Sequence, residues 1–405
     1  MMKKTIAIVG GGASALILAA MLDEKKFDVT IYERHATLGR KFLVAGDGGF
    51  NLTHSEDMEA FIKRYSYDNF DAPFLEKSLQ YFTNSDTRDW LKTWGIDTYI
   101  GSSKRVFPVN GIKPIEVLNA ILTVLKIKNV TLKTKHNWQG WTAKNELIFL
   151  QNDLKLLVKA DFIVFSLGGA SWSKTGSDGA WMVFFNEKGI KIIPFQASNC
   201  AYKVQWNESF LKQAEGKSLK NVALSCGGIS KMGEVVVTRF GMEGGAIYAL
   251  SSAIRKELNA QSLATIYLDL KPVLTISDIQ KKLSNKGNNS LTTLLKEQLH
   301  LSDTAISLLK SQLTKDEFLN LDNLISKIKN LPLSISASAP IDEAISTVGG
   351  IALEEVDAHF QLKKLQNHYV IGEMLDWDAP TGGYLLQACF SMGQYLAECL
   401  NEKNT

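Results

Sequence analysis

A glycine-rich turn between a strand-like and a helix-like segment is the feature that most constrains the fold. Residues 5–9 form a β-branched apolar run, and an Ala- and Leu-rich segment follows the motif Gly10-x-Gly12-x-x-Ala15. After a charged break, residues 28–32 form a second β-type run. This order predicts a βαβ unit. The glycines allow a tight turn and let a pyrophosphate approach the backbone at the helix N-terminus.

An acidic residue stands where such a unit binds the ribose of a dinucleotide. Glu33 lies 18 residues beyond Ala15, at the end of the second predicted strand. Its carboxylate is expected to accept hydrogen bonds from ribose hydroxyls and to repel a 2′-phosphate. The pattern therefore predicts a site for FAD or NAD rather than NADP, against the alternative of a purely structural glycine turn.

The same N-terminal stretch shares some features with a signal peptide or membrane anchor. Lys3 and Lys4 precede eighteen uncharged residues, from Thr5 to Leu22. Three consecutive glycines interrupt these residues, and each glycine costs up to about 1 kcal/mol of helix propensity. A strand, turn and helix explain the segment better, so we expect a cytoplasmic protein without a membrane partner.

Composition argues against several other classes of protein. The 405 residues are 45% hydrophobic and 21% charged, which is typical of a globular chain with two or three domains. The net charge of +3 is too small to suggest a nucleic-acid partner. The four cysteines form no CxxC pair and the six histidines form no HExxH motif, so we expect neither a metal site nor a redox dithiol.

The residue pattern changes along the chain as it would in an interrupted domain. Residues 73–94 have helical spacing, 130–158 resemble a meander of short strands, and 162–167 are typical of a buried parallel strand. A β-rich stretch and a Lys-, Leu- and Ser-rich helical stretch follow before α/β character returns. We therefore predict an α/β domain at 1–190 and 345–405, a β-rich substrate domain at 191–275 and 331–344, and a small helical insert at 276–330.

Two further segments favour FAD over NAD. Residues 39–54 contain Arg40, Lys41 and a glycine-rich loop, whose alternative reading is a flexible surface loop. A flavin needs backbone N–H groups and cations near its pyrophosphate and ring, whereas a nicotinamide dehydrogenase has no need for such a loop here. Residues 372–384 repeat the order strand, glycine, acid, loop and helix, and would present a second helix N-terminus to the flavin.

With these motifs, the chain resembles nearly end to end a family of bacterial FAD flavoproteins of the glutathione-reductase-like superfamily, with aminoacetone-oxidase-like and bile-acid-reductase-like members. The resemblance implies a Rossmann-like FAD-binding domain interrupted by a β-barrel-like domain and a small helical insert. Many relatives have Arg-Cys where this chain has Gly49-Phe50, which places it in a different subfamily. The matching stretches are Ile8 to Ala15, GRKFLVAGDGGFNLTH (39–54), KRVFP (104–108), LGGASWSKTGSDGAW (167–181), TRFGMEGGAIYALS (238–251), DEAISTVGGI (342–351) and GEMLDWDAPTGGYLLQACFSMG (372–393).

The resemblance also implies a set of contacts to noncovalently bound FAD. Trp138 is assigned a contact to the adenine through its backbone, although a core tryptophan is an equal alternative. Gly168 is assigned to FAD or to closing the sheet. The remaining implied contacts are Gly10, Gly12, Ala13, Ser14, Ala15, Glu33, Arg40, Lys41, Asn51, Gly372, Glu373, Asp376, Gly382, Gly383 and Tyr384.

The expected activity is that of a FAD-dependent oxidoreductase acting on a small molecule, with NAD(P)H as a possible transient donor and no nicotinamide domain of its own. The chain shows no Ser-His-Asp, paired-carboxylate or thiolate pattern that would support hydrolysis. Two alternatives stay open at this point. One is a flavoprotein that modifies RNA, and the other is a flavin-binding electron carrier or regulatory protein without its own substrate.

No catalytic residue follows from the sequence, but two arginines are candidates. Arg105, preceded by Lys104, stands before Phe107, and Arg239 stands before a glycine-rich stretch in the β-rich segment. We expect both guanidinium groups to line one pocket and to favour a substrate with an anionic or carbonyl oxygen. The alternative is that both form structural ion pairs away from the flavin.

Overall fold

The computed structural model describes residues 2–44, 49–67, 73–284 and 289–403. These residues form two compact units. The first comprises Met1–Gln196 and Ser346–Thr405, and the second comprises Ala197–Ile345. The predicted glycine loop at 46–48 lies outside the described residues.

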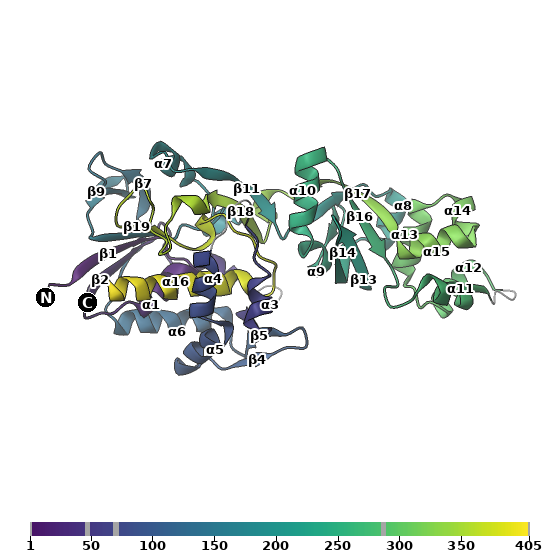
Figure 1. Cartoon of the computed structure of the whole chain (residues 1–405), viewed down its shortest axis with the longest axis horizontal. Helices are drawn as coiled ribbons and strands as arrows, with labels where there is room; N and C mark the ends of the chain where they lie inside the picture. Colours follow the sequence, from purple (N-terminus) through teal and green to yellow (C-terminus); the bar gives the residue numbers. More distant parts are fainter. Residues whose placement is uncertain (1, 45–48, 68–72, 285–288, 404–405) are drawn as a thin grey trace. The chain divides into compact units, whose positions relative to one another are not determined.

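A five-stranded parallel sheet forms the centre of the first unit (Figure 1). Its order is β19-β10-β1-β2-β6, and every neighbouring pair is parallel. Every side chain of β10 is buried, as its uninterrupted apolar sequence predicts. The Rossmann-like α/β fold is thereby confirmed. The strands are β1 (Lys4–Val9), β2 (Phe27–Tyr32), β6 (Thr131–Lys133), β10 (Phe162–Phe165) and β19 (His368–Val370).

Two helices, α1 (Ala13–Met21) and α16 (Tyr384–Glu402), pack against each other in this unit. Gly393 permits their close approach, because a Cβ at this position would lie 2.7 Å from the carbonyl oxygen of Ser14. Further helices and strands complete the α/β unit: α2 (Arg40–Val44), β3 (Thr53–His54), α3 (Met58–Ile62), α4 (Pro73–Tyr81), α5 (Asn84–Thr93), β4 (Thr98–Ile100), β5 (Arg105–Pro108), α6 (Pro114–Ile127) and α7 (Met182–Glu187).

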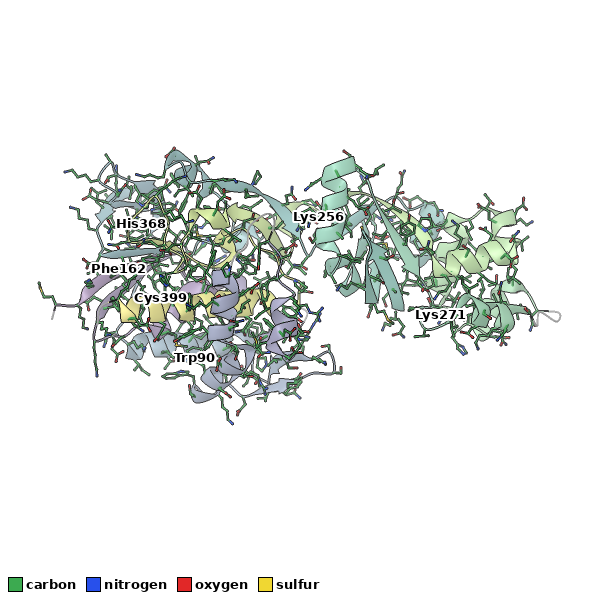
Figure 2. All side chains as sticks on the ribbon, viewed as in Figure 1. Trp90, Phe162, Lys256, Lys271, His368 and Cys399 are labelled. Carbon is green, nitrogen blue, oxygen red and sulfur yellow. The ribbon has the colours of Figure 1, made fainter. Side chains whose placement is uncertain are left out.

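The predicted meander begins later than expected. The first strand-like piece after Val130 is β6, which joins the edge of the parallel sheet beside β2. The meander itself consists of β7 (Asn137–Trp141), β8 (Leu147–Gln151) and β9 (Leu154–Val158). Its tryptophans pack in an aromatic cluster with residues of the parallel sheet, including His368, which is labelled in Figure 2.

The second unit contains a closed barrel of six strands, which confirms the expected β-barrel. Helices surround it, and those at 276–330 bury their leucines in the same apolar cluster as the barrel strands, so the predicted insert shares the core of the barrel. The strands are β12 (Tyr202–Val204), β13 (Ser218–Cys226), β14 (Ile229–Val237), β15 (Gly241–Glu243), β16 (Ala264–Asp269) and β17 (Leu331–Ser338). The helices are α8 (Glu208–Ala214), α9 (Gly245–Tyr248), α10 (Ser251–Gln261), α11 (Ile276–Ser284), α12 (Leu291–Glu297), α13 (Asp303–Gln312), α14 (Lys315–Leu319) and α15 (Leu321–Lys329).

The chain leaves and re-enters the first unit through two strands, β11 (Ile192–Ser198) and β18 (Ser346–Ile351). These strands pair with each other in a two-stranded sheet. The first unit therefore extends to Gln196, a few residues beyond the position 190 expected from composition, because β11 pairs with a strand of that unit.

Candidate functional site

The glycine turn after β1 is built to leave the N-terminus of α1 open. Gly10 has φ +99°, and a Cβ there would lie 2.3 Å from the carbonyl oxygen of Ser166, so this position is restricted to glycine. Gly12 caps α1, and no side chain accepts a hydrogen bond at this cap. A Cβ at Gly12 would meet nothing closer than the Ser166 oxygen at 3.9 Å. Free N–H groups and open space thus coincide at the start of the helix, as an anion site requires.

Glu33 lies directly after β2, with its carboxylate held beside this turn. Its Oε2 accepts a hydrogen bond of 2.9 Å from the N–H of Gly11, and its Oε1 accepts one of 2.8 Å from the N–H of His35. The group is half-buried. Each oxygen retains a lone pair, so the carboxylate is fixed in place and can still accept hydrogen bonds from two hydroxyls.

Two of the predicted contacts from opposite ends of the chain meet each other. Lys41 Nζ donates to Glu373 Oε2 at 2.8 Å and to Ser171 Oγ at 3.0 Å. Both charged groups are mostly buried, at 28% and 13% exposure. Arg40 is instead exposed, and donates to the carbonyl oxygen of Lys174 at 3.0 Å. The structure therefore joins the N-terminal and C-terminal motifs through Lys41.

The C-terminal motif packs directly on α1. A Cβ at Gly372 would lie 2.6 Å from Ser14 Oγ, which is itself 2.8 Å from Ser166 Oγ. Asp376 accepts a hydrogen bond of 3.0 Å from the N–H of Gly349. Ser14 is buried at the first turn of α1, where its hydroxyl links the helix to the end of β10.

The start of α16 repeats the arrangement at α1. Gly383 caps this 19-residue helix with φ +102°, and again no side chain accepts a hydrogen bond at the cap. A Cβ at Gly383 would lie 2.5 Å from Thr53, so the helix start is pressed against β3. The positive end of a second helix dipole is thereby fixed in the same unit.

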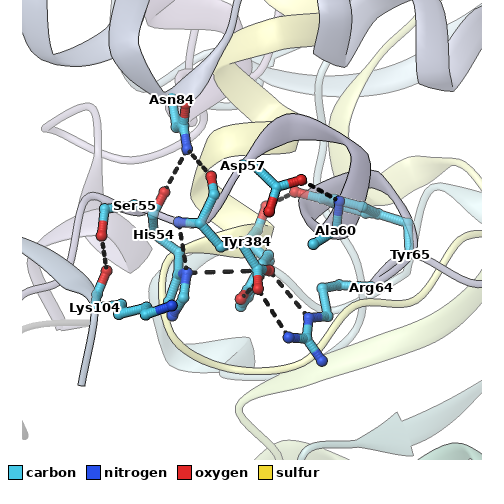
Figure 3. A network of polar contacts seen from close by, with 10 residues as sticks. His54, Ser55, Asp57, Ala60, Arg64, Tyr65, Asn84, Lys104 and Tyr384 are labelled. Carbon is cyan, nitrogen blue, oxygen red and sulfur yellow. Dashed lines mark hydrogen bonds and ion pairs between the residues drawn. The ribbon is translucent and has the colours of Figure 1, made fainter.

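A polar network holds the first residue of α16 from the side (Figure 3). Tyr384 donates its phenolic hydrogen to Glu56 Oε1 at 2.6 Å, while Arg64 donates to both oxygens of this carboxylate at 3.0 and 2.8 Å. Tyr65 donates its phenolic hydrogen to the carbonyl oxygen of Tyr384 at 2.7 Å. The ring of His54 stacks on that of Tyr384 with a centroid distance of 5.1 Å. Both the side chain and the backbone of Tyr384 are thus anchored.

The protonation states in this network follow from burial and hydrogen bonding. Burial alone would raise the pKa of Glu56, but hydrogen bonds from Arg64 and Tyr384 outweigh it and lower the pKa. Burial and the hydrogen bond to Glu56 raise the pKa of Tyr384, and burial lowers that of His54. Ionised Glu56 therefore stabilises the folded state above its usual pKa, and this contribution is lost as the pH falls through the lowered value.

The two candidate arginines have different surroundings. A Cβ at Gly382 would lie 3.2 Å from Arg105 Nε, so this guanidinium lies beside the C-terminal motif. Arg239 belongs to the second unit, where it forms ion pairs of 3.3 and 3.1 Å with Glu208 and Glu215 and is 61% exposed. Those ion pairs match the structural alternative for Arg239. A pocket shared by both arginines stays a prediction.

The other predicted contacts are also located in the first unit. The side chain of Trp138 is buried in the aromatic cluster, as the core alternative expects, and its Nε1 has no hydrogen-bond partner among the described residues. The carbonyl oxygen of Gly168 accepts a hydrogen bond of 2.9 Å from Trp181 Nε1. Asn51 is half-buried just before β3, and Ala13 and Ala15 lie in the first turn of α1.

No sequence pattern indicates the Glu56–Arg64 ion pair. These residues are eight positions apart and flank the short helix α3, so they match neither the i,i+4 spacing of a helical pair nor any motif. A neighbouring pair, Glu59 and Lys63, does have i,i+4 spacing and is almost fully exposed. The i,i+4 rule therefore identifies the exposed pair Glu59–Lys63 and misses the pair formed by the buried Glu56.

We predict that Arg64→Met loosens the first turn of α16, because Glu56, only 8% exposed, loses its bidentate partner. A loss of about 1 to 2 kcal/mol would raise local amide exchange about 5- to 30-fold. Hydrogen exchange of peptides covering Tyr384 to Gln387 measures this change. The control Lys63→Met removes an exposed cation one residue away and should leave these peptides unchanged. Equal exchange in both variants would contradict the anchoring role.

Comparisons with known proteins agree with this architecture. The HI0933-like protein Rossmann domain family matches residues 4–399. The chain is 25% identical over 411 residues to the 3-dehydro-bile acid delta(4,6)-reductase of Clostridium scindens, with 97% of each chain covered. It is 23% identical to the ribosomal RNA dihydrouridine synthase of Haemophilus influenzae, with 95% of each covered.

A solved structure shares the fold at low sequence identity. The 3-ketosteroid delta1-dehydrogenase of Sterolibacterium denitrificans superimposes with a TM-score of 0.50 at 12% identity, over 99% of this chain and 100% of that one. In the described part of the chain, no helix is long and apolar enough to cross a membrane, and no group of three His, Cys, Asp or Glu side chains could hold a metal ion. The chain belongs to the HI0933-like family and is a FAD-dependent oxidoreductase.

Proposed function

We propose that this oxidoreductase holds FAD across the N-termini of α1 and α16 and acts on a small molecule, with NAD(P)H as a transient electron donor. The observation that carries the proposal is the pair of helix starts, both capped by glycine and both without a side-chain acceptor. Uncapped N–H groups at two helices of one unit are suited to a ligand with a phosphate and an electron-rich ring.

The residues of the site fit this cofactor. The open space at Gly12 admits a pyrophosphate, and the fixed Glu33 carboxylate has lone pairs free for ribose hydroxyls. Lys41 and Glu373 neutralise each other, so they position neighbouring groups without adding net charge. Bound FAD supplies the capacity to accept and donate hydride equivalents, and the protein supplies position and electrostatics.

A small molecule is favoured over RNA as the substrate by the distribution of charge. The first unit contains 28 Lys and Arg against 28 Asp and Glu, and the second contains 17 against 14. The second unit thus carries the whole net charge of +3, which is modest for a nucleic-acid-binding surface. RNA modification, the function named for the Haemophilus influenzae relative, remains the second candidate, and salt-dependent binding of ribosomal RNA fragments tests it.

The first prediction for this function concerns Gly12. Gly12→Val should fold, because Gly12 has φ −82° and its side chain would enter open space, yet it should abolish FAD binding by filling the place of the pyrophosphate. Absorbance of the purified protein near the flavin bands measures bound FAD. Gly10→Val is the contrasting variant, because its Cβ would collide with the Ser166 oxygen and prevent folding. A yellow Gly12→Val protein would contradict the placement of the pyrophosphate.

The second prediction concerns Glu33. Glu33→Ala removes the carboxylate that would accept hydrogen bonds from the ribose hydroxyls. Such bonds to a charged acceptor are worth about 1.5 to 3 kcal/mol, so FAD should bind roughly 10- to 150-fold more weakly. Titration of the apoprotein with FAD, followed by flavin fluorescence, gives the dissociation constant. Glu33→Gln keeps the shape and should show an intermediate loss. An unchanged constant for Glu33→Ala would show that the carboxylate serves only the backbone of Gly11 and His35.

The third prediction concerns the electron donor. The described residues contain one five-stranded parallel sheet, and it carries one glycine turn like that at Gly10 to Gly12. We therefore expect NADH or NADPH to bind only transiently. Anaerobic addition of each nucleotide to the holoprotein should bleach the flavin spectrum without forming a stable nucleotide complex. Protein that stays oxidised with both nucleotides, but is reduced by dithionite, would contradict NAD(P)H as the donor.

A further inference from the structure

The small sheet β3-β5-β4 lies against the start of α16, where Gly383 approaches Thr53 and the His54 ring stacks on Tyr384. Arg105 pairs with His54 across β3 and β5, and Phe107 pairs with Tyr99 across β5 and β4. Side chains alternate along a strand, so Arg105 and Phe107 lie on one face. Val106, between them, is fully buried on the opposite face. Arg105 and Phe107 thus lie on the face of this sheet opposite to the one on which Val106 is buried.

An aromatic pair forms the apolar part of this face. The rings of Phe107 and Tyr99 stack with a centroid distance of 5.6 Å and an interplanar angle of 27°. Tyr99 is 43% exposed. Gly49 and Gly101 border the pair, because Cβ atoms there would lie 3.4 and 3.0 Å from the Phe107 ring. The backbone of these two glycines therefore lies close to the half-buried Phe107 ring, and Tyr99 is the exposed member of the pair.

Arg105 supplies an unneutralised positive charge at the edge of this pair. Its guanidinium makes no hydrogen bond or ion pair with the described residues, whereas Arg64 is neutralised by both oxygens of Glu56. It lies beside Gly382, one residue before the cap of α16, so the helix dipole adds to the same positive field. A half-buried arginine in such a field favours an anionic or strongly polarised oxygen.

We propose that Arg105, Phe107 and Tyr99 form the substrate-recognition surface, and that it takes a ring compound carrying a carboxylate. Arg105 binds the carboxylate while the ring system lies on the Phe107–Tyr99 pair. Two residues on one strand face are about 7 Å apart, which matches a carboxylate attached directly or by a short link to a fused ring. The assignment rests on the proposed function, since Gly382 belongs to the motif expected to contact FAD.

The test is binding of 2-naphthoate to the holoprotein, measured by calorimetry and by perturbation of the flavin spectrum. Saturable binding of 2-naphthoate is expected, with much weaker binding of the neutral 2-naphthamide and of acetate, which lacks the ring. Arg105→Met should weaken 2-naphthoate at least tenfold, and Arg105→Lys less, because lysine keeps the charge without the bidentate geometry. Phe107→Ala should weaken it as well. The control Lys92→Met removes an exposed cation of α5 and should change nothing.

Several results would overturn the proposal. These are no binding of 2-naphthoate to wild type, equal binding of acid and amide, or unchanged affinity in both Arg105 variants. A changed flavin reduction potential in Arg105→Met with unchanged 2-naphthoate affinity would assign Arg105 to the flavin instead of the substrate. Colourless wild-type protein that FAD does not reconstitute would contradict the proposed function separately, and calorimetry would still test Arg105.

Discussion

Close contact between the first turn of α1 and the C-terminal segment is the constraint on which the first unit depends. Ser14 meets Gly393 of α16 through its carbonyl oxygen and Gly372 through its hydroxyl, and both approaches exclude a Cβ. Two distant parts of the chain are therefore fixed to the first turn of α1, one through the Ser14 backbone and the other through its short side chain. Because both contacts are too close for a Cβ, they hold α1 and α16 in a fixed relative orientation and so fix the direction in which both helix starts present their N–H groups.

Three cations of this unit, each partly buried, are paired with carboxylates of the same unit. Lys41 is paired with Glu373, Arg64 with Glu56, and Arg34 with Asp178. Burying such pairs is costly unless the geometry is good, and truncating one partner leaves the other charge unpaired. Unlike these three cations, Arg105 at the edge of the C-terminal motif has no ion-pair partner among the described residues.

The parts of the fold that could be predicted from the sequence are those set by local patterns. The turn Gly10 to Ala15, the helices over 73–94 and the strand predicted at 162–167 depend on the order of residues within one element. The structure confirms them, with the strand ending at Phe165. The edge strand β6 cannot be told from the meander by its sequence, because three exposed residues have no periodicity that reveals a parallel partner. The anchoring of Tyr384 by Glu56 and Tyr65 spans more than 300 positions, and no local rule connects such residues. The placement in a subfamily, based on Gly49 and Phe50, stays a prediction.

The pairing of β11 with β18 also has a consequence for how this architecture diversifies. The strands that lead into and out of the second unit are hydrogen-bonded neighbours. Ala197–Ile345 is therefore an insertion whose two ends are adjacent. An insertion of this kind can be lengthened, shortened or exchanged between relatives while the fold of the first unit is preserved. Its barrel and helices share one core, so it would have to be exchanged as a single block. The surface proposed at Arg105, Phe107 and Tyr99 would stay with the nucleotide-binding framework in such an exchange, because these residues belong to the first unit.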